Sequence, residues 1–255
     1  MEMSNSRSAF HLTRRALALF AAAALTAPMV LTSGGAAYAS TRLALANPSG
    51  NAYFPLVVGA TWKYKDVGGP TAGSTLIIHV VSAHKTASGE AVDVQDTVGA
   101  GSFTAQYIIG PNGAIEIEGS AGSGSTTETI SSTSSYFIPS ASQVVSCHPC
   151  HFSADFTTKV AGYAMREHLA ETATSAGART VSLPAGTFHA EKLQMALKMT
   201  SSTSGVSFAD TFVYAVYLVK DVGVVETGAG SASTSVLGQA TKVSTGAEEL
   251  LKYTP

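Results

Sequence analysis

The fold is indicated most clearly by one stretch, residues 208–220, which has the sequence FADTFVYAVYLVK. Its even-numbered and odd-numbered positions form two alternating sets, and both sets are largely apolar, a period of two that is typical of a β-strand. The many Val, Thr and Tyr residues also favour a strand over a helix. We therefore expect Phe208–Lys220 to be a central strand, covered on both faces of its sheet.

Similar runs of β-branched and aromatic residues lie before and after this stretch, separated by Gly, Pro, Asn and Asp. Most links between the runs are too short for a crossover helix, so the strands run mainly antiparallel. Several runs exceed five or six residues, and long twisted strands coil. We predict an all-β, mainly antiparallel fold: a single curved sheet or half-open barrel of long meandering strands. The other predicted strands are Thr61–Asp66, Ser74–His84, Ala91–Thr97, Phe103–Ile109, Ala114–Glu118, Glu128–Ile138, Phe152–Val160, Met165–Thr174, Thr187–Thr200, Val224–Thr227 and Ser233–Ser244.

For three further segments, between the predicted strands or after them, the sequence predicts the local structure. Ser175-Ala176-Gly177 is predicted as a turn, because it combines small residues with Gly. The long link Pro139–His151 holds two prolines and both cysteines, and we expect no helix in it. In the last ten residues, we expect one short helical turn around Glu248–Lys252.

The first 39 residues differ in kind from the rest. Arg14 and Arg15 precede an apolar run, and Ala37-Tyr38-Ala39 offers the small residues that a signal peptidase accepts. The run is too short for a membrane-spanning helix of roughly 20 residues. We predict a signal peptide at 1–39, with a retained membrane anchor as the alternative. The pair Arg14-Arg15 leaves open whether export follows the general secretory or the twin-arginine route.

The remaining chain is divided by composition into a flexible lead-in at 40–52, an exported β-domain at 53–245 and a C-terminal tail at 246–255. Charged residues make up only 13% of the chain and the formal net charge is −2, so there is no basic surface for nucleic acid phosphates. After cleavage of the leader we expect no transmembrane segment. This composition is typical of a secreted or extracytoplasmic protein of the cell envelope or periplasm.

Three sequence segments match a known pattern. The opening segment runs from Tyr53-Phe54-Pro55-Leu56 to Trp62-Lys63-Tyr64, the central one is VSLPAGTF at 181–188, and the closing one is YLVKDVGVV at 217–225. Together they resemble a widespread group of bacterial exported and lipoprotein-like domains of unknown function, with a YFPL…GxxWxY opening, a VPAGTF centre and a GVGxV hairpin. Leu183 stands where the group usually has Val, and Asp221 where it usually has the first Gly.

The resemblance implies a curved antiparallel sheet, similar to the half-barrels of lipoprotein carriers, and no catalytic residues. The residues themselves suggest structural roles for these segments. Trp62 and Tyr64 fall on one strand face and should anchor the core, because aromatic side chains bury large areas. Asp221-Val222-Gly223 should form a tight reversal of the chain.

Cys147-His148-Pro149-Cys150-His151 is the sharpest chemical motif. In an exported chain with only two cysteines, a Cys147–Cys150 disulfide is our first interpretation. The same spacing is the attachment pattern of a c-type haem, in which Cys147 and Cys150 bind the porphyrin and His151 binds iron. Metal binding or thiol exchange is a third alternative. We expect no resident cofactor and no metal.

No catalytic constellation is evident elsewhere. Glu167-His168 and His189-x-Glu191 would form an acid–base or metal site only if folding brought them together. Asp93, Asp96, Glu116 and Glu118 are expected on the polar face of a sheet. We therefore predict a non-enzymatic exported protein of the cell envelope or the secreted fraction, which binds a hydrophobic small molecule, a lipid or an envelope protein. The alternative is an electron-transfer protein with a c-type haem on Cys147, Cys150 and His151.

Overall fold

A computed structural model describes residues 50–69, 71–86, 89–99, 101–110, 115–121, 126–133, 139–160, 163–203, 206–236 and 239–255 of the 255-residue chain. The expectations for the leader at 1–39 and for residues 40–49 of the lead-in lie outside these residues. No helix in the described part is long and apolar enough to cross a membrane.

The described residues form a single antiparallel sheet and one short helix. The strands are β1 (Thr61–Val67), β2 (Thr75–Lys85), β3 (Glu90–Val98), β4 (Gly101–Ile109), β5 (Ile115–Ala121), β6 (Thr126–Thr133), β7 (Cys150–Val160), β8 (Tyr163–Leu183), β9 (Gly186–Thr203), β10 (Val206–Val219), β11 (Gly223–Thr227), β12 (Gly230–Val236), β13 (Gln239–Thr245) and β14 (Ala247–Thr254); the helix is α2 (Ala141–Ser146). The predicted all-β, antiparallel fold is confirmed.

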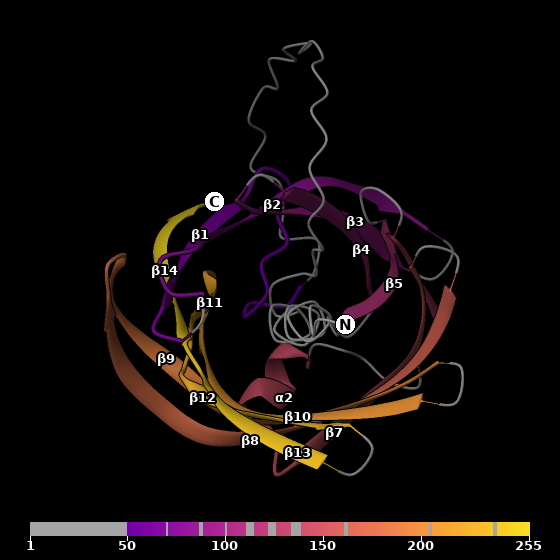
Figure 1. The fold of residues 1–255 in the computed structure, drawn as a ribbon. Coiled ribbons are helices and arrows are strands. Elements are labelled where there is room, and N and C mark those ends of the chain that lie inside the picture. The colour runs from indigo at the N-terminus through magenta and orange to yellow at the C-terminus, as the bar shows by residue number, and fades with distance from the viewer. Residues whose placement is uncertain are drawn as a thin grey trace.

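The sheet follows the chain as a long meander. Strands β1 to β10 lie side by side in sequence order, β14 lies beside β1, and the hairpin β12–β13 extends the sheet beyond β10. Short strand β11 pairs with β10 on one side and with two residues of β14 on the other. The strands therefore curve around a common interior (Figure 1). Among the described residues, only the short β11, through two residue pairs with β14, links the two ends of this curve, so the sheet does not close into a regular barrel.

Strand β10 contains the stretch that suggested the fold. The inward set Asp210, Phe212 and Tyr214 is buried, as the alternation requires. Thr211 and Val213 on the opposite face are exposed, so the expectation of cover on both faces is wrong for this half of the strand. The next half differs: Ala215 and its neighbours are buried on both faces. At this point the segment between β11 and β12 reaches β10, where the Gly228 N–H donates to the carbonyl of Ala215 at 2.8 Å.

Strand β8 is longer than predicted. The expected turn at Ser175-Ala176-Gly177 is wrong, because β8 continues through it to Leu183. The pairing with β9 instead shifts register between Ser175 and Ala178. Gly177 has a φ of 74°, a left-handed conformation that Gly adopts without strain. A bulge thus replaces the predicted turn and bends the strand.

The C-terminal region also departs from the prediction. The expected strand Ser233–Ser244 is two strands, β12 and β13, which pair with each other. The expected helical turn around Glu248–Lys252 is wrong, because Ala247–Thr254 is strand β14 and pairs along the whole of β1. Leu250 is fully buried. Segment 246–255, predicted as a tail, therefore belongs to the sheet.

Helix α2 corrects the expectation that residues 139–151 contain no helix. Ser140 is its N-cap, and a capping box joins Ser140 to Gln143: the Ser140 N–H donates to Gln143 Oε1 at 2.9 Å, and the Gln143 N–H donates to Ser140 Oγ at 3.4 Å. Val144 is fully buried in the core. The helix lies inside the curve of the sheet (Figure 1), so it covers part of the inner face.

The aromatic anchors of β1 are in the core, as predicted. Trp62 and Tyr64 are each 5% exposed. Trp62 Nε1 donates a hydrogen bond to the carbonyl of Val222 at 2.5 Å, and the Tyr64 hydroxyl donates to the carbonyl of Val224 at 2.8 Å. The opening and closing segments of the sequence pattern therefore hold each other in place.

The predicted reversal between β10 and β11 is also present. Asp221 has a φ of 62° and Gly223 a φ of 99°. Asp is one of the few side chains that tolerate the left-handed region, which is consistent with Asp221 at this position. The Asp221 N–H donates to the carbonyl of Ala52 at 2.6 Å. The reversal is thereby fixed to the segment that precedes β1.

Asn51, at the end of the predicted lead-in, is fully buried. Its Nδ2 donates to the carbonyl of Pro139 at 2.8 Å, and its Oδ1 accepts from the N–H of Tyr53 at 3.0 Å. The bond to Pro139 joins the start of the described chain to the link before α2.

Candidate functional site

Cys147 and Cys150 flank the turn that joins α2 to β7. Cys147 is the C-cap of α2 and fully buried, and Cys150 is the first residue of β7. Their sulfur atoms lie at disulfide distance, 1.98 Å, and their Cα atoms are 5.0 Å apart. The carbonyl of Cys147 accepts from the N–H of Ser175 at 2.8 Å, which ties this corner to the bulge of β8.

The histidines of the motif face outward. His148 and His151 are exposed, and His151 Nδ1 lies 3.2 Å from the hydroxyl of Thr172 on the neighbouring strand. His151 and the partly buried Cys150 point to opposite faces of β7, as adjacent strand residues do. A haem on this motif would need both thiols free and His151 on their side, so the arrangement favours the disulfide interpretation.

The inner face of the sheet carries carboxylates that the sequence analysis did not assign there. Asp96 on β3 is fully buried, and both of its oxygens lack a hydrogen-bond partner. Burial raises the pKa of its carboxyl group well above the usual range. The expectation that Asp96 lies on a polar sheet face is therefore wrong. An unsatisfied buried polar group costs about 1–3 kcal/mol, so this position is unfavourable for stability.

Asp93, on the opposite face of β3 from Asp96, lies on a polar face of the sheet, as predicted. Asp93 is half-buried and accepts hydrogen bonds from Ser82 Oγ at 2.5 Å and from Gln106 Nε2 at 2.9 Å. Glu116 and Glu118 belong to β5, whose side chains lie outside the described part. One strand thus carries a satisfied outer carboxylate and an unsatisfied inner one.

Glu171 on β8 is a second inward carboxylate. It is 3% exposed, its Oε1 accepts from the hydroxyl of Tyr214 at 3.0 Å, and its Oε2 has no partner. Burial raises the pKa of Glu171 to about 7, although the bond from Tyr214 opposes the shift. The group thus changes charge near neutral pH.

Two further carboxylates, Glu167 on β8 and Asp210 on β10, are each 6% exposed. Asp210 faces inward beside Met199 of β9. Burial raises the pKa of Asp210, and a hydrogen bond with Thr234 lowers it in part. In the sequence, only the alternation of strand residues could have indicated that these carboxylates are buried. Glu167 and Glu171 fall on the same strand face as Leu169, and Asp210 falls on the same face as Phe212.

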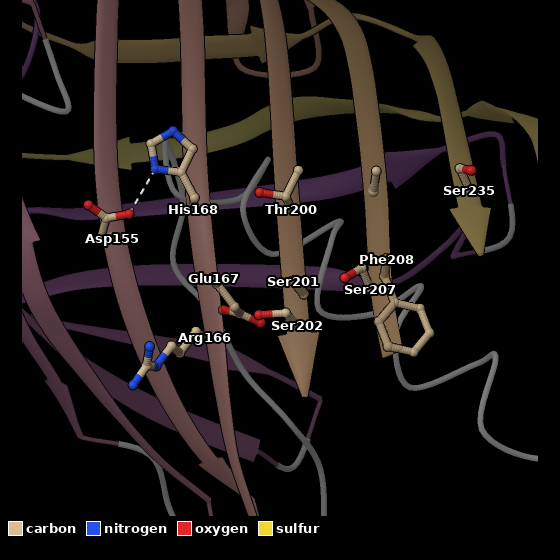
Figure 2. Close-up of a pocket in the computed structure, with 11 residues that line it drawn as sticks. Asp155, Arg166, Glu167, His168, Thr200, Ser201, Ser202, Ser207, Phe208 and Ser235 are labelled. Carbon is tan, nitrogen blue, oxygen red and sulfur yellow. Dashed lines mark hydrogen bonds and ion pairs between the residues drawn. The ribbon is translucent and has the colours of Figure 1, made fainter. Parts of the chain in front are cut away.

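A cleft of about 680 Å³ lies across β7, β8, β9, β10 and β12. Among the residues that line it, His168 Nδ1 lies 2.8 Å from Asp155 Oδ1, and both side chains are about half exposed (Figure 2). Arg166 and a set of residues with hydroxyl side chains also line the cleft: Thr200, Ser201, Ser202, Ser207 and Ser235. Ser201 pairs in register with the buried Glu167, on the face opposite His168. No hydrogen bond joins His168 to a serine among the described residues.

The two His–Glu pairs of the sequence are not brought together. His168 pairs in register with Thr200 and His189 with Thr180, near opposite ends of β8. Glu167 and His168 also point to opposite faces, one buried and one exposed. Within the described part of the chain, no three His, Cys, Asp or Glu side chains gather as a metal site would require.

Comparison with known proteins gives no family. No family model matches the chain, and no curated protein matches it. Two solved structures are similar. One is a Bacteroides fragilis protein assigned as exported, with a YmcC-like fold, at 11% identity and a TM-score of 0.37, covering 78% of this chain and 97% of that one. The other is a Parabacteroides distasonis protein assigned as a lipoprotein, at 14% identity and a TM-score of 0.45, covering 80% and 99%.

Proposed function

We propose that this chain is a non-enzymatic exported protein that holds a hydrophobic small molecule or lipid against the inner face of its curved sheet. The observation that carries the proposal is the apolar character of that face along the meander. The inward side chains form a single buried cluster that includes Trp62, Ile78, Val94, Tyr107, Leu169, Leu193, Met195, Leu197, Phe212, Val216 and Leu250.

The number of strands supports a ligand in the interior. About eight strands curled into a barrel enclose a space that their own side chains fill, and the enclosed width grows with strand number. Here β1 to β10, β11 and β14 follow one another around the interior. In the described part, α2 is the one helix inside the curve (Figure 1). We infer from this number of strands that the interior can take up apolar material besides the side chains of the sheet itself.

Export rests on the leader features of residues 1–39 and on the cysteine pair. Cys147 and Cys150 are the only cysteines of the chain, and a disulfide between them would persist only in an oxidising compartment. We therefore place the protein outside the cytoplasmic membrane, in the cell envelope or the secreted fraction. The bond would stabilise the corner that positions α2.

Displacement of the fluorescent apolar probe 1-aminoanthracene by dodecanol tests the proposed function. We expect saturable probe binding that dodecanol reverses. Ala105→Phe, which enlarges a buried inward side chain of β4, should weaken probe binding. The matched control Thr104→Phe alters the opposite face of the same strand and should leave binding unchanged.

Two results would overturn this proposal. One is the absence of saturable probe binding by the intact protein. The other is a Soret absorbance band in natively purified protein, which would assign Cys147, Cys150 and His151 to a haem instead.

A further inference from the structure

The buried charged side chains of the described residues are all acidic. They are Asp96, Glu167, Glu171 and Asp210, with exposed fractions of 0%, 6%, 3% and 6%. No Lys, Arg or His is buried in the part of the chain that the structure describes. Among the described residues, the charged groups buried in the interior are therefore acidic.

Register places these groups on the inner face. Asp96 pairs with Ile78 of β2 and shares a face with Val94. Glu171 pairs with Leu197 of β9. Ile78, Val94 and Leu197 belong to the buried core cluster, so both carboxyl groups point into the interior.

The two carboxyl groups approach the interior from different sides. Strands β3 and β8 lie on opposite sides of the curve (Figure 1). Both oxygens of Asp96 and one oxygen of Glu171 are buried without a hydrogen-bond partner. A buried polar group that the protein leaves unpaired calls for a specific explanation, such as an absent ligand or ion.

The surroundings of Asp96 are apolar and phenolic. Burial raises the pKa values of Tyr64 and Tyr107, and charge on Asp96 adds to both shifts, for Tyr64 after the larger contribution of Glu248. The Tyr64 hydroxyl already donates to the carbonyl of Val224. Asp96 therefore acts electrostatically on two buried phenols, and both of its oxygens are free acceptor positions.

We propose that the interior binds amphiphilic amines, with Asp96 accepting hydrogen bonds from the cationic nitrogen and the inner apolar face holding the chain. This inference rests on the proposed function and names its ligand class. An ammonium group suits the site because charge-assisted hydrogen bonds to a carboxylate are stronger than neutral ones. Glu171, with one free oxygen, offers a second acceptor from the far side.

Three probes of equal chain length test the inference: dodecylamine, dodecanol and dodecanoate, each below its micelle concentration. Their dissociation constants are measured by 1-aminoanthracene displacement at pH 7. We expect dodecylamine to bind at least tenfold more tightly than dodecanol, and dodecanoate to bind most weakly. Asp96→Asn should remove most of the preference for the amine over the alcohol.

The matched control is Asp93→Asn on the outer face of β3. That variant also removes one carboxylate, so a general electrostatic effect would lower amine affinity in both variants, whereas a specific site would respond only to Asp96→Asn. The comparison of the three probes on the unmodified protein remains decisive if Asp96→Asn does not fold.

The outcomes separate the inference from the proposed function. Equal binding of the three probes, or an amine preference that Asp96→Asn leaves intact, would refute the amine site and leave the apolar interior standing. Failure of all three probes to bind would refute both.

Discussion

At the scale of single residues, the most informative groups are carboxylates in an apolar interior. Asp96 and Glu171 are buried with free oxygens, a position that costs stability unless something pairs with them. Their burial follows from strand parity, since Asp96 shares a face with Val94, and Glu171 with Leu169. Alternation alone could indicate this face, but not that the other strands would close over it.

Glu171 gives a pH-dependent prediction. Its folded-state pKa, about 7, lies above the ordinary value of 4.5, so the neutral side chain favours folding below pH 4.5 and this contribution is lost as pH rises through 7. Glu171→Gln should keep the bond from Tyr214 and remove this loss. Between pH 4.5 and pH 8, we expect the variant to gain on the order of 3 kcal/mol relative to the parent, measured by urea unfolding.

Tyr214→Phe should change the pH dependence of stability in the opposite direction to Glu171→Gln. Because the Tyr214 hydroxyl bond lowers the pKa of Glu171, its loss should destabilise the protein more at pH 8 than at pH 4.5. Identical pH profiles for the parent, Glu171→Gln and Tyr214→Phe would show that Glu171 does not titrate in the interior.

The cysteine pair gives a second prediction. A disulfide that closes so short a loop contributes about 2 kcal/mol in the chain-entropy model. The double variant Cys147→Ser/Cys150→Ser should therefore unfold more easily than the oxidised protein by about this amount, and reduction should bring the parent protein to the same level. Thiol titration of unreduced, denatured protein should find no free thiol; two free thiols would contradict the disulfide.

At the scale of elements, the strands followed from the sequence more readily than their ends. Period two in residues 208–220 identified β10, and each predicted strand overlaps an observed one. Helix α2 was missed because six residues give no helical period, although Ser140 and Gln143 have capping-box spacing. β14 was missed because Glu248, Glu249 and Leu250 are good helix formers, and pairing with β1 overrides that preference.

The junction between β13 and β14 yields a prediction about close packing. A Cβ atom on Gly246 would lie 2.2 Å from the carbonyl oxygen of Gly68, so Gly246→Ala must move backbone. We expect a loss of roughly 1–3 kcal/mol in the free energy of unfolding. Gly228→Ala is the matched control, because the nearest atom there is 3.5 Å away; equal effects of the two substitutions in thermal unfolding would contradict the packing account.

At the scale of the whole molecule, one antiparallel sheet curves so that its strands share an interior. Hydrogen bonds from Trp62 and Tyr64 to the β10–β11 reversal and β11, together with β14 beside β1, join the beginning of the sheet to its end. This arrangement gathers the apolar faces of distant strands into a single cluster. The proposed capacity for a hydrophobic ligand is a property of the curved sheet as a whole.

Native mass spectrometry of the protein isolated from its producing cells, without detergent, tests this central claim most directly. The account predicts a chain that begins at Ser40 and carries one small amphiphilic molecule, which is released when the protein is denatured. A chain that carries no such molecule and takes up neither dodecylamine nor dodecanol when these are added would contradict it.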